Sequence, residues 1–353
     1  MKRIKSVLLL PNIVTGYLYF YVHFVVEVLC FFVLARLIGD SPFLWIVPLI
    51  YDAVAFVPQS IIGYVSDKFP TVKIGLIGTF LLISGFILFG LNIVSPYVSI
   101  TLVALGNAFL HVDGAEVTLR TSKGKLSHSA IFVSGGSFGV IAGKLLGMSN
   151  LSFWILVVLG LSIIPFIILA NMYRNDVGNE REKLEFNYAN EKMNGGVLIL
   201  LAIFVVMIRG YMGYGLPTSW NKTVIQTILL YSAMGVGKAL GGVLADTYGV
   251  KSIGIWSSLL ALPFLLFGDK LMFISLIGVL FFSMTMSITL ALIVSVLKKT
   301  PGLAFGMTTI GLFWGSVPVF FFKFNYIFIN CVIIVVFTLV STFIFKKIIK
   351  DGV

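Results

Sequence analysis

Ionisable side chains inside long apolar stretches are the residues of this sequence best placed to do chemistry. His23 and Glu27 stand four residues apart in one such stretch, and this spacing puts both side chains on one helix face, where they could share a proton. A charged group inside a membrane-spanning helix costs about 2.5–3.5 kcal/mol on insertion scales, so its presence indicates a function by default. We therefore predict that five residues carry coupling protons: Glu27, Asp113, His23, His111 and Asp52.

Each of these residues also has a purely structural interpretation. A histidine in a packed helix is often only hydrogen-bonded, and a buried carboxyl group can be half of a static ion pair. Glu116 and Arg120 are four residues apart near the end of their stretch, and this spacing predicts such a pair, which we leave out of the site. Asp52 is either a second proton site or the partner of Lys238.

Two cations lie inside apolar stretches of the second half of the chain, where these stretches contain no acidic residue near their middle. Arg209, which Tyr211 follows closely, and Lys238 would attract an anion if both face a common cavity. A guanidinium suits a carboxylate or a phosphonate, because it can donate two parallel hydrogen bonds. We predict that Arg209, Lys238 and Tyr211 bind an anionic substrate. The competing interpretation pairs Arg209 with Asp52 or Asp113.

The composition decides which elements must position these residues. Of the 353 residues, 59% are hydrophobic and only 11% are charged, and the mean hydropathy is +1.06. A soluble domain carries about 25% charged residues, so most side chains of this chain must face lipid. A transmembrane helix needs about 20 predominantly apolar residues. We predict an all-α polytopic membrane protein with twelve transmembrane helices, at residues 14–37, 43–65, 74–93, 97–119, 128–148, 151–171, 195–216, 223–245, 252–268, 271–296, 303–323 and 326–345.

A polar segment divides the twelve predicted helices into two groups of six. Residues 172–194 hold charges of both signs, so we predict a six-helix bundle at 1–171, a cytoplasmic linker at 172–194 and a second bundle at 195–353. Most of the 25 Lys and Arg residues fall on the linker side, and the positive-inside rule then predicts that both termini are cytoplasmic and that the chain lies in the cell membrane. The net charge of +11 is therefore a topology signal and does not indicate a nucleic-acid partner.

Two turns on the predicted cytoplasmic side repeat each other. Gly63, Asp67 and Lys68 follow the second stretch. Gly242 and Asp246 follow the eighth, at the same offset for the glycine (242 − 63 = 179) and the aspartate (246 − 67 = 179). The glycine lets helices approach closely, and the aspartate can pair with a basic residue or accept hydrogen bonds from a facing helix N-terminus. We interpret the turns as gate latches in two copies of a six-helix unit, with a generic charged turn as the alternative.

These motifs resemble the signature of the major facilitator superfamily and, more closely, that of its fosmidomycin-resistance-type branch. Five stretches carry the resemblance: HFVVE at 23–27, QSIIGYVSDKFP at 59–70, LGNAFLHVD at 105–113, IFVSGGSFGVIAGK at 131–144 and RGYMG at 209–213. The chain departs from the branch pattern at Ser60, Val112 and Lys144, where that pattern has proline. The resemblance implies a transporter of two six-helix bundles that exports small compounds in exchange for protons.

The predicted function is secondary active transport by alternating access, as a proton-coupled antiporter for efflux of a small organic compound or drug. The alternatives are uptake of a small organic anion, or a non-transporting receptor or channel on the same scaffold. An enzyme is not expected, because HExxH, DDxxD-like carboxylates and a Ser/His/Asp set are missing, and a GxxxxGKS/T loop for an ATP-driven pump is missing too. Cys30 and Cys331 lie in apolar stretches, so neither a disulfide nor a metal site is expected, and no cofactor. We expect a monomer.

Overall fold

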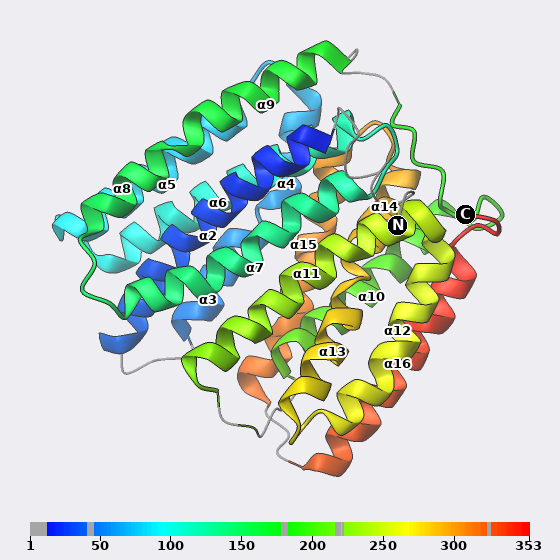
Figure 1. Ribbon diagram of the computed structural model, residues 1–353. Helices are drawn as coiled ribbons and strands as arrows, with labels where there is room; N and C mark the ends of the chain where they lie inside the picture. The colour runs from blue at the N-terminus through cyan, green and yellow to red at the C-terminus, as the bar shows by residue number, and fades with distance from the viewer. Residues whose placement is uncertain (1–12, 41–45, 178–182, 216–219, 221, 323–325) are drawn as a thin grey trace.

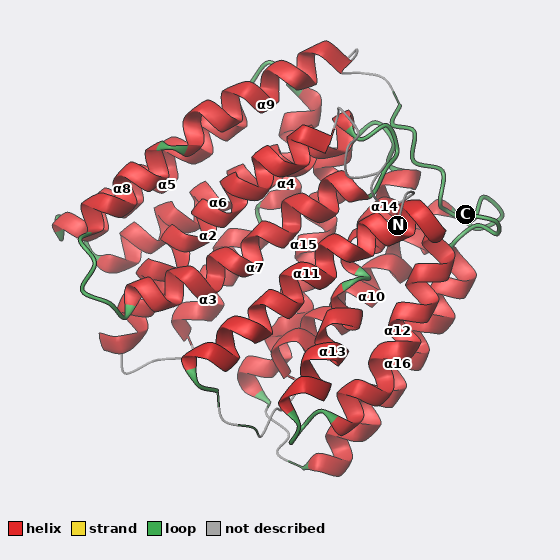
Figure 2. Cartoon of the chain, viewed as in Figure 1, coloured by secondary structure: helices red, strands yellow, loops and turns green. Residues whose placement is uncertain are grey.

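The computed structural model describes residues 13–40, 46–177, 183–215, 220, 222–322 and 326–353. Within these residues every regular element is a helix, and the helices run close to one common direction (Figure 2). Twelve helical segments are long and apolar enough to cross a membrane. The predicted all-α fold with twelve membrane-spanning helices is therefore confirmed.

The helices of the first half form six of these twelve segments. They are α2 (Val14–Asp40), α3 (Ile46–Phe56), α4 (Gln59–Lys68), α5 (Ile74–Leu91), α6 (Pro96–Thr121), α7 (Ser127–Gly147), α8 (Phe153–Leu161) and α9 (Ile163–Val177). Two of the segments are interrupted, so that α3 with α4, and α8 with α9, each make one span. The break between α3 and α4 falls at Pro58, because proline has no N–H to donate and its ring clashes with the preceding turn.

The helices of the second half form the other six segments. They are α10 (Gly195–Gly215), α11 (Val224–Tyr248), α12 (Val250–Phe267), α13 (Met272–Ser283), α14 (Met286–Val296), α15 (Pro301–Phe321) and α16 (Ile327–Ile348). Here α13 and α14 together make one span. The two halves lie side by side, with the first half in blue to green and the second in yellow-green to red (Figure 1). The contact between them involves α4 with α15 and α7 with α11.

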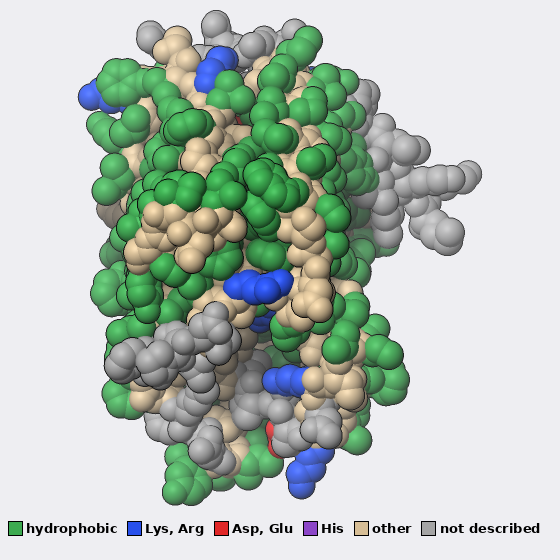
Figure 3. All heavy atoms as spheres, turned by 90° about the vertical axis from the view of Figure 1, so that its left-hand side faces the viewer, with side chains coloured by type: hydrophobic (Ala, Val, Ile, Leu, Met, Phe, Trp, Pro, Cys, Tyr) green, Lys and Arg blue, Asp and Glu red, His purple; other side chains and the backbone are tan. Residues whose placement is uncertain are grey.

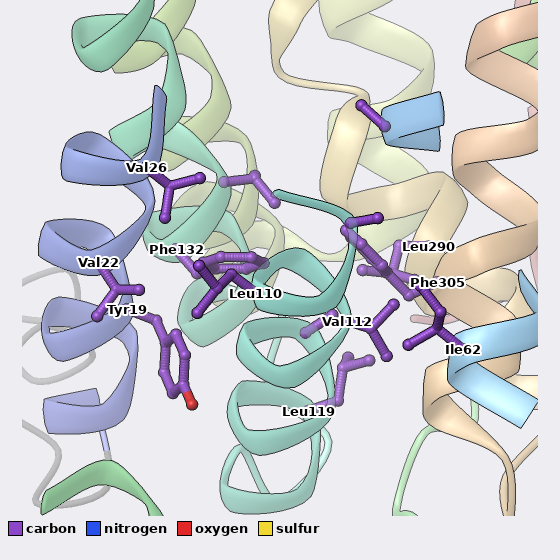
Figure 4. Close-up of a cluster of buried hydrophobic side chains, with 14 of the residues drawn as sticks. Tyr19, Val22, Val26, Ile62, Leu110, Val112, Leu119, Phe132, Leu290 and Phe305 are labelled. Atoms are coloured by element: carbon purple, nitrogen blue, oxygen red, sulfur yellow. The ribbon is translucent and has the colours of Figure 1, made fainter. Parts of the chain in front are cut away.

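Apolar side chains fill the space between the halves and also cover the outside. In the interior, Phe132 of α7 and Phe305 of α15 have ring centroids 6.2 Å apart, and Leu290 of α14 packs in the same cluster (Figure 4). On the outside, the face in Figure 3 is mostly hydrophobic, with few Lys and Arg side chains. Exposed rings such as Phe80 and Phe328 are acceptable there because lipid, not water, surrounds a membrane-spanning bundle.

The predicted linker at 172–194 begins within α9, which ends at Val177. Its residues 183–194 cross one end of the bundle and contact both halves (Figure 1). The backbone N–H of Leu184 donates to the carbonyl oxygen of Lys298 in the second half at 3.0 Å. The hydroxyl of Tyr188 donates to the carbonyl oxygen of Gly124, between α6 and α7, at 2.7 Å. We name this end of the bundle, which also carries the C-terminus, the linker face.

Candidate functional site

A cluster of three buried side chains from α2 and α6 forms the chemical centre of the first half. His23 and Glu27 lie one helical turn apart on α2, and His111 projects from α6 toward them. The Nε2 atom of His23 is 3.6 Å from Oε1 of Glu27, and the Nε2 atom of His111 is 3.5 Å from the same oxygen. The structure thus brings together three of the five side chains predicted to carry protons, and we name them the His–Glu cluster.

The hydrogen bonds around the His–Glu cluster fix how its rings are oriented. Nδ1 of His23 lies 3.0 Å from the carbonyl oxygen of Phe132, and Nδ1 of His111 lies 3.0 Å from that of Asn107. Because a carbonyl oxygen only accepts, each Nδ1 carries the hydrogen and each neutral ring keeps a lone pair on Nε2. Both Nε2 atoms lie within 3.6 Å of Oε1 of Glu27, so the ligand atoms of the three side chains come together in one small volume.

The other two predicted proton carriers have different surroundings. Asp113 lies on another face of α6, where it accepts a hydrogen bond from the Tyr19 hydroxyl and packs against Gly75 of α5. Asp52 is buried in α3 and hydrogen-bonds to Tyr214 of α10, in the second half. The structure therefore distributes the five predicted residues over one cluster and two separate carboxyl groups.

Arg209 lies between two cavities that hydroxyl groups line. One small cavity lies in the second half and is lined by Arg209, by the hydroxyl groups of Ser258, Thr285, Thr338 and Ser341, and by apolar side chains that include Phe282 and Phe345. Within the described part of the chain, the guanidinium donates one hydrogen bond, from Nη1 to Thr289 Oγ1 at 3.1 Å. Its remaining donors are therefore still able to bind a guest in a volume lined by hydroxyl groups.

The second small cavity lies between the halves, touches Arg209 and is partly lined by apolar side chains such as Leu290 and Phe305. Ser129 of α7 supplies a hydroxyl group from the first half, and Ser287 and Thr308 supply hydroxyl groups from the second. The Ser287 hydroxyl is buried and has no hydrogen-bond partner among the residues that the structure describes. A buried polar group without a partner is costly, so this hydroxyl favours a ligand that hydrogen-bonds to it.

The competing interpretation, in which Arg209 pairs with Asp52 or Asp113, is not what the structure shows. Across the described part of the chain, no carboxylate oxygen lies within 4.0 Å of Arg209 or of Lys238. Tyr211 does not line either cavity, and its ring packs edge-on against Phe337, with centroids 5.6 Å apart. Arg209 is thus a buried cation without a carboxylate partner among the described residues.

The Asp67 carboxylate joins the two halves at the linker face. It accepts hydrogen bonds from the backbone N–H groups of Gly302, at 3.1 Å, and Leu303, at 2.9 Å, in the first turn of α15. The N-terminus of a helix carries a partial positive charge, which favours a carboxylate there. Gly63 permits this approach, because a Cβ atom at position 63 would overlap the backbone of Gly302. Lys68 is exposed and lies over the ring of Phe69 instead.

Asp246 makes the matching contact in the opposite direction. Its carboxylate accepts the backbone N–H of Leu126 at 2.8 Å and that of Ser127 at 2.9 Å, at the start of α7 in the first half. Gly242 faces Ala130 of α7 so closely that an added Cβ atom would overlap the Ala130 methyl group. Each half therefore places one aspartate on a helix N-terminus of the other half.

The two latch aspartates differ in their other neighbours. Asp67 lies 3.5 Å from the guanidinium of Arg120, and Arg120 also binds Glu116 at 2.9 Å, the pair predicted from the sequence spacing. Glu116 in turn accepts a hydrogen bond from the Ser66 hydroxyl. Asp67 thus belongs to a polar network of its own half, and this network holds the carboxylate beside the N-terminus of α15.

Comparison with known proteins identifies the fold. No protein-family model matches the chain. Among solved structures, the human organic anion transporter MFSD10 (TETRAN) is similar with a TM-score of 0.68 and 12% sequence identity, over 95% of this chain and 100% of that chain. The fucose:proton symporter FucP of E. coli is similar with a TM-score of 0.64 and 13% identity, over 96% of this chain and 99% of that chain. The fold of this chain is that of the major facilitator superfamily.

The sequence similarity is to one particular branch. The fosmidomycin resistance protein of Escherichia coli (strain K12) is 25% identical over 235 residues, which cover 59% of this chain and 57% of that protein. The match thus spans a little more than half the length of the relative. The predicted resemblance to the fosmidomycin-resistance-type branch is confirmed, and these similar proteins are a resistance protein and transporters, not enzymes.

Three residues of the site are not found by the sequence reasoning. Asn107 donates from Nδ2 to Oε1 of Glu27 at 3.1 Å and lies 2.7 Å from the hydroxyl of Tyr51, while Tyr19 binds Asp113. Asn107 has a signal in the sequence, because it is an uncharged polar residue four positions before the buried His111 on the same helix. The two tyrosines have none, since aromatic residues are frequent throughout this chain.

Proposed function

We propose that this protein is a secondary transporter that works by alternating access. The observation that carries the proposal is the pair of latches, in which Asp67 holds α15 and Asp246 holds α7 at the same face of the bundle. Such contacts between halves can form when one face closes and break when it opens. The similarity to solved major facilitator transporters supports this proposal through the fold.

The proposed substrate is a small organic compound with a carboxylate or phosphonate group, and the proposed direction is export. Arg209 supports an anionic substrate, since it lines both cavities beside several hydroxyl groups and has no carboxylate within 4.0 Å in the described residues. Lys238 would add a second positive charge, and Tyr211 would act through the packing of α10. The name of the fosmidomycin resistance protein favours export.

The proposed driving force is a proton gradient. The buried Glu27, Asp113 and Asp52, with His23 and His111, are the residues that would take up and release the coupling protons. Asp52 is the carboxyl group of this set that also contacts the second half, through Tyr214. Movement of one half against the other would therefore change the surroundings of Asp52 directly.

The proposed topology places the linker face in the cytoplasm of a cell whose membrane the protein spans. Basic residues gather there, among them Lys73, Lys192, Lys251 and Lys299, as the positive-inside rule requires. Several residues that support the same prediction from the sequence, namely Lys2, Arg3, Lys5 and Arg181, lie outside the described residues. We propose a monomer, in which one chain supplies both halves of the transport path.

Proteoliposomes test the proposed function. The purified protein is reconstituted, a pH gradient is imposed, and the flux of labelled organic anions, cations and neutral compounds is measured. We expect a saturable flux of an anionic compound that the pH gradient accelerates and an uncoupler abolishes. A channel would give a flux that does not saturate, and a receptor would give binding without flux. Either result would contradict the proposal.

A further inference from the structure

The His–Glu cluster also has the geometry of a metal site. Sequence spacing predicts no such site, because His23 and His111 lie on different helices. We propose that His23, Glu27 and His111 bind one divalent transition metal ion through Nε2, a carboxylate oxygen and Nε2. The proposal does not depend on the proposed transport of an organic anion. A bound metal ion would exclude coupling protons from these three side chains, so metal binding and their proposed proton carriage compete.

The distances within the His–Glu cluster fit a metal ion. Metal–nitrogen and metal–oxygen bonds to zinc are about 2.1 Å long, so two ligand atoms of a tetrahedral site are about 3.4 Å apart. The two Nε2 atoms lie 3.6 and 3.5 Å from Oε1 of Glu27. All three ligand atoms lie within 4.8 Å of one another. A metal ion can therefore be bound with only small side-chain movements, and it would keep a fourth position open.

The surrounding hydrogen bonds are those that metal-binding histidines use. A ligating histidine donates its other ring N–H to a carbonyl or a carboxylate, which fixes the tautomer and the direction of the lone pair. His23 does so to Phe132, and His111 does so to Asn107. Asn107 additionally donates to Glu27, and therefore orients the third ligand as well. Gly136 of α7 leaves the space that the His23 ring occupies, since a Cβ atom there would overlap Nε2.

The chemistry of the three ligands selects the class of ion. Imidazole nitrogen suits zinc, copper, iron, cobalt and nickel ions, whereas magnesium and calcium prefer oxygen ligands only. Within the described residues, Glu27 has no Lys or Arg nitrogen within 4.0 Å, so no protein cation replaces the metal charge. Lys238 of α11 is the basic side chain whose charge acts on all three ligands, and it opposes a bound cation. Replacing Lys238 should therefore tighten metal binding.

The experiment is a direct titration of the purified protein with Co²⁺ and Zn²⁺. The protein is purified in detergent with a tag that contains no histidine, because a polyhistidine tag would itself bind metal. Binding is followed by calorimetry and by the visible absorption of four-coordinate Co²⁺. The variants are His23→Gln and His111→Gln, and the matched control is His128→Gln. The chain has three histidines, and His128 is the one outside the cluster.

The proposal predicts that the unmodified protein binds one Co²⁺ ion and shows the four-coordinate absorption. Binding should weaken about tenfold or more in His23→Gln and in His111→Gln, should be unchanged in His128→Gln, and should tighten in Lys238→Met. X-ray absorption of the zinc-loaded protein should count two imidazole ligands. Failure of the unmodified protein to bind stoichiometric metal would overturn the proposal, whether or not the variants fold. Equal binding by the unmodified protein and the cluster variants would overturn it too, because the metal would then lie elsewhere.

Discussion

The carboxylate of Asp67 accepts the backbone N–H of Leu303 at 2.9 Å and thereby joins the end of α4 in the first half to the beginning of α15 in the second. Since α4 and α15 belong to different halves, the proposed alternating access would break this contact when the linker face opens. Asp246 makes the equivalent contact with α7. The closed linker face is therefore held by two similar contacts, and each should be separable from the other by mutation.

Neutralising a latch aspartate should open the linker face more often. Asp67→Asn and Asp246→Asn remove the charge that faces a helix N-terminus, and a hydrogen bond to a charged group contributes about 1.5–3 kcal/mol. Each variant should therefore shift the population about tenfold or more toward the state with the linker face open. Accessibility of single cysteines on this face to a thiol reagent measures the shift. Unchanged accessibility in both variants would show that the aspartates are not latches.

A methyl group at the contact between α4 and α15 should prevent closure. In Gly63→Ala the new Cβ atom overlaps the backbone of Gly302, which has no flexible side chain to move away. Gly213→Ala is the matched control, because a Cβ atom at position 213 would have no heavy atom within 4 Å. We expect loss of transport with normal folded yield in Gly63→Ala and normal transport in the control. Normal transport in Gly63→Ala would show that this close approach is dispensable.

Replacing Arg209 by lysine should weaken the binding of an anionic substrate. The positive charge survives, but the guanidinium that can donate two parallel hydrogen bonds is lost. Losing one charge-assisted hydrogen bond costs about 1.5–3 kcal/mol, or roughly ten- to a hundredfold in affinity. Lys222→Arg is the control. It exchanges the same two residue types, in the opposite direction, at an exposed site near the opposite end of the bundle. If anionic substrates bind Arg209→Lys as tightly as the unmodified protein, the guanidinium does not contact them.

Removing the carboxyl groups that are proposed to carry protons should uncouple transport from the pH gradient. Glu27→Gln or Asp113→Asn keeps the shape of the side chain but cannot exchange a proton. Substrate exchange between equal concentrations at zero gradient should continue, while acceleration by the gradient should disappear. Flux in proteoliposomes with and without a gradient separates these two quantities. Gradient-driven transport in both variants would leave Asp52 as the next residue to examine.

The topology is tested by two cysteines at opposite ends of the bundle. Lys192→Cys lies on the linker face and should resist an impermeant thiol reagent in intact cells, then react after lysis. Asn150→Cys lies in the exposed turn between α7 and α8 at the other end, and should react in intact cells. The reverse pattern would refute the proposed cytoplasmic linker.

The sequence predicts the fold well, and it draws attention to Asp67 and Asp246, because both inferences depend on local or repeated patterns. Hydropathy alone indicates the twelve spans, since a lipid environment excludes most charged residues from them. Asp67 and Asp246 are found because the same short motif recurs at one offset, and their helix N-terminal partners follow from the charge of a helix end. Lys68 shares the motif, yet it contacts aromatic rings, because adjacent helix positions point in different directions.

Contacts between distant helices are what the sequence does not predict. Helical spacing relates His23 to Glu27, but nothing in the spacing brings His111 to the same carboxylate or separates it from Asp113. That outcome depends on the rotation of α6 against α2, which tertiary packing sets. The position of Tyr211 shows the same limit, because its nearness to Arg209 in sequence does not put its ring in either of the two cavities that Arg209 lines.

Alternate opening of the two faces of the bundle can be measured with paired spin labels. One pair, Lys73→Cys with Lys299→Cys, spans the two halves at the linker face, and the other, Asn150→Cys with Lys270→Cys, spans them at the opposite end. Distances are measured by pulsed electron resonance with the native cysteines replaced by alanine. The Asp67→Asn and Asp246→Asn double variant should lengthen the first distance and shorten the second. Two distances that stay constant in the double variant, or that lengthen together, would contradict alternating access.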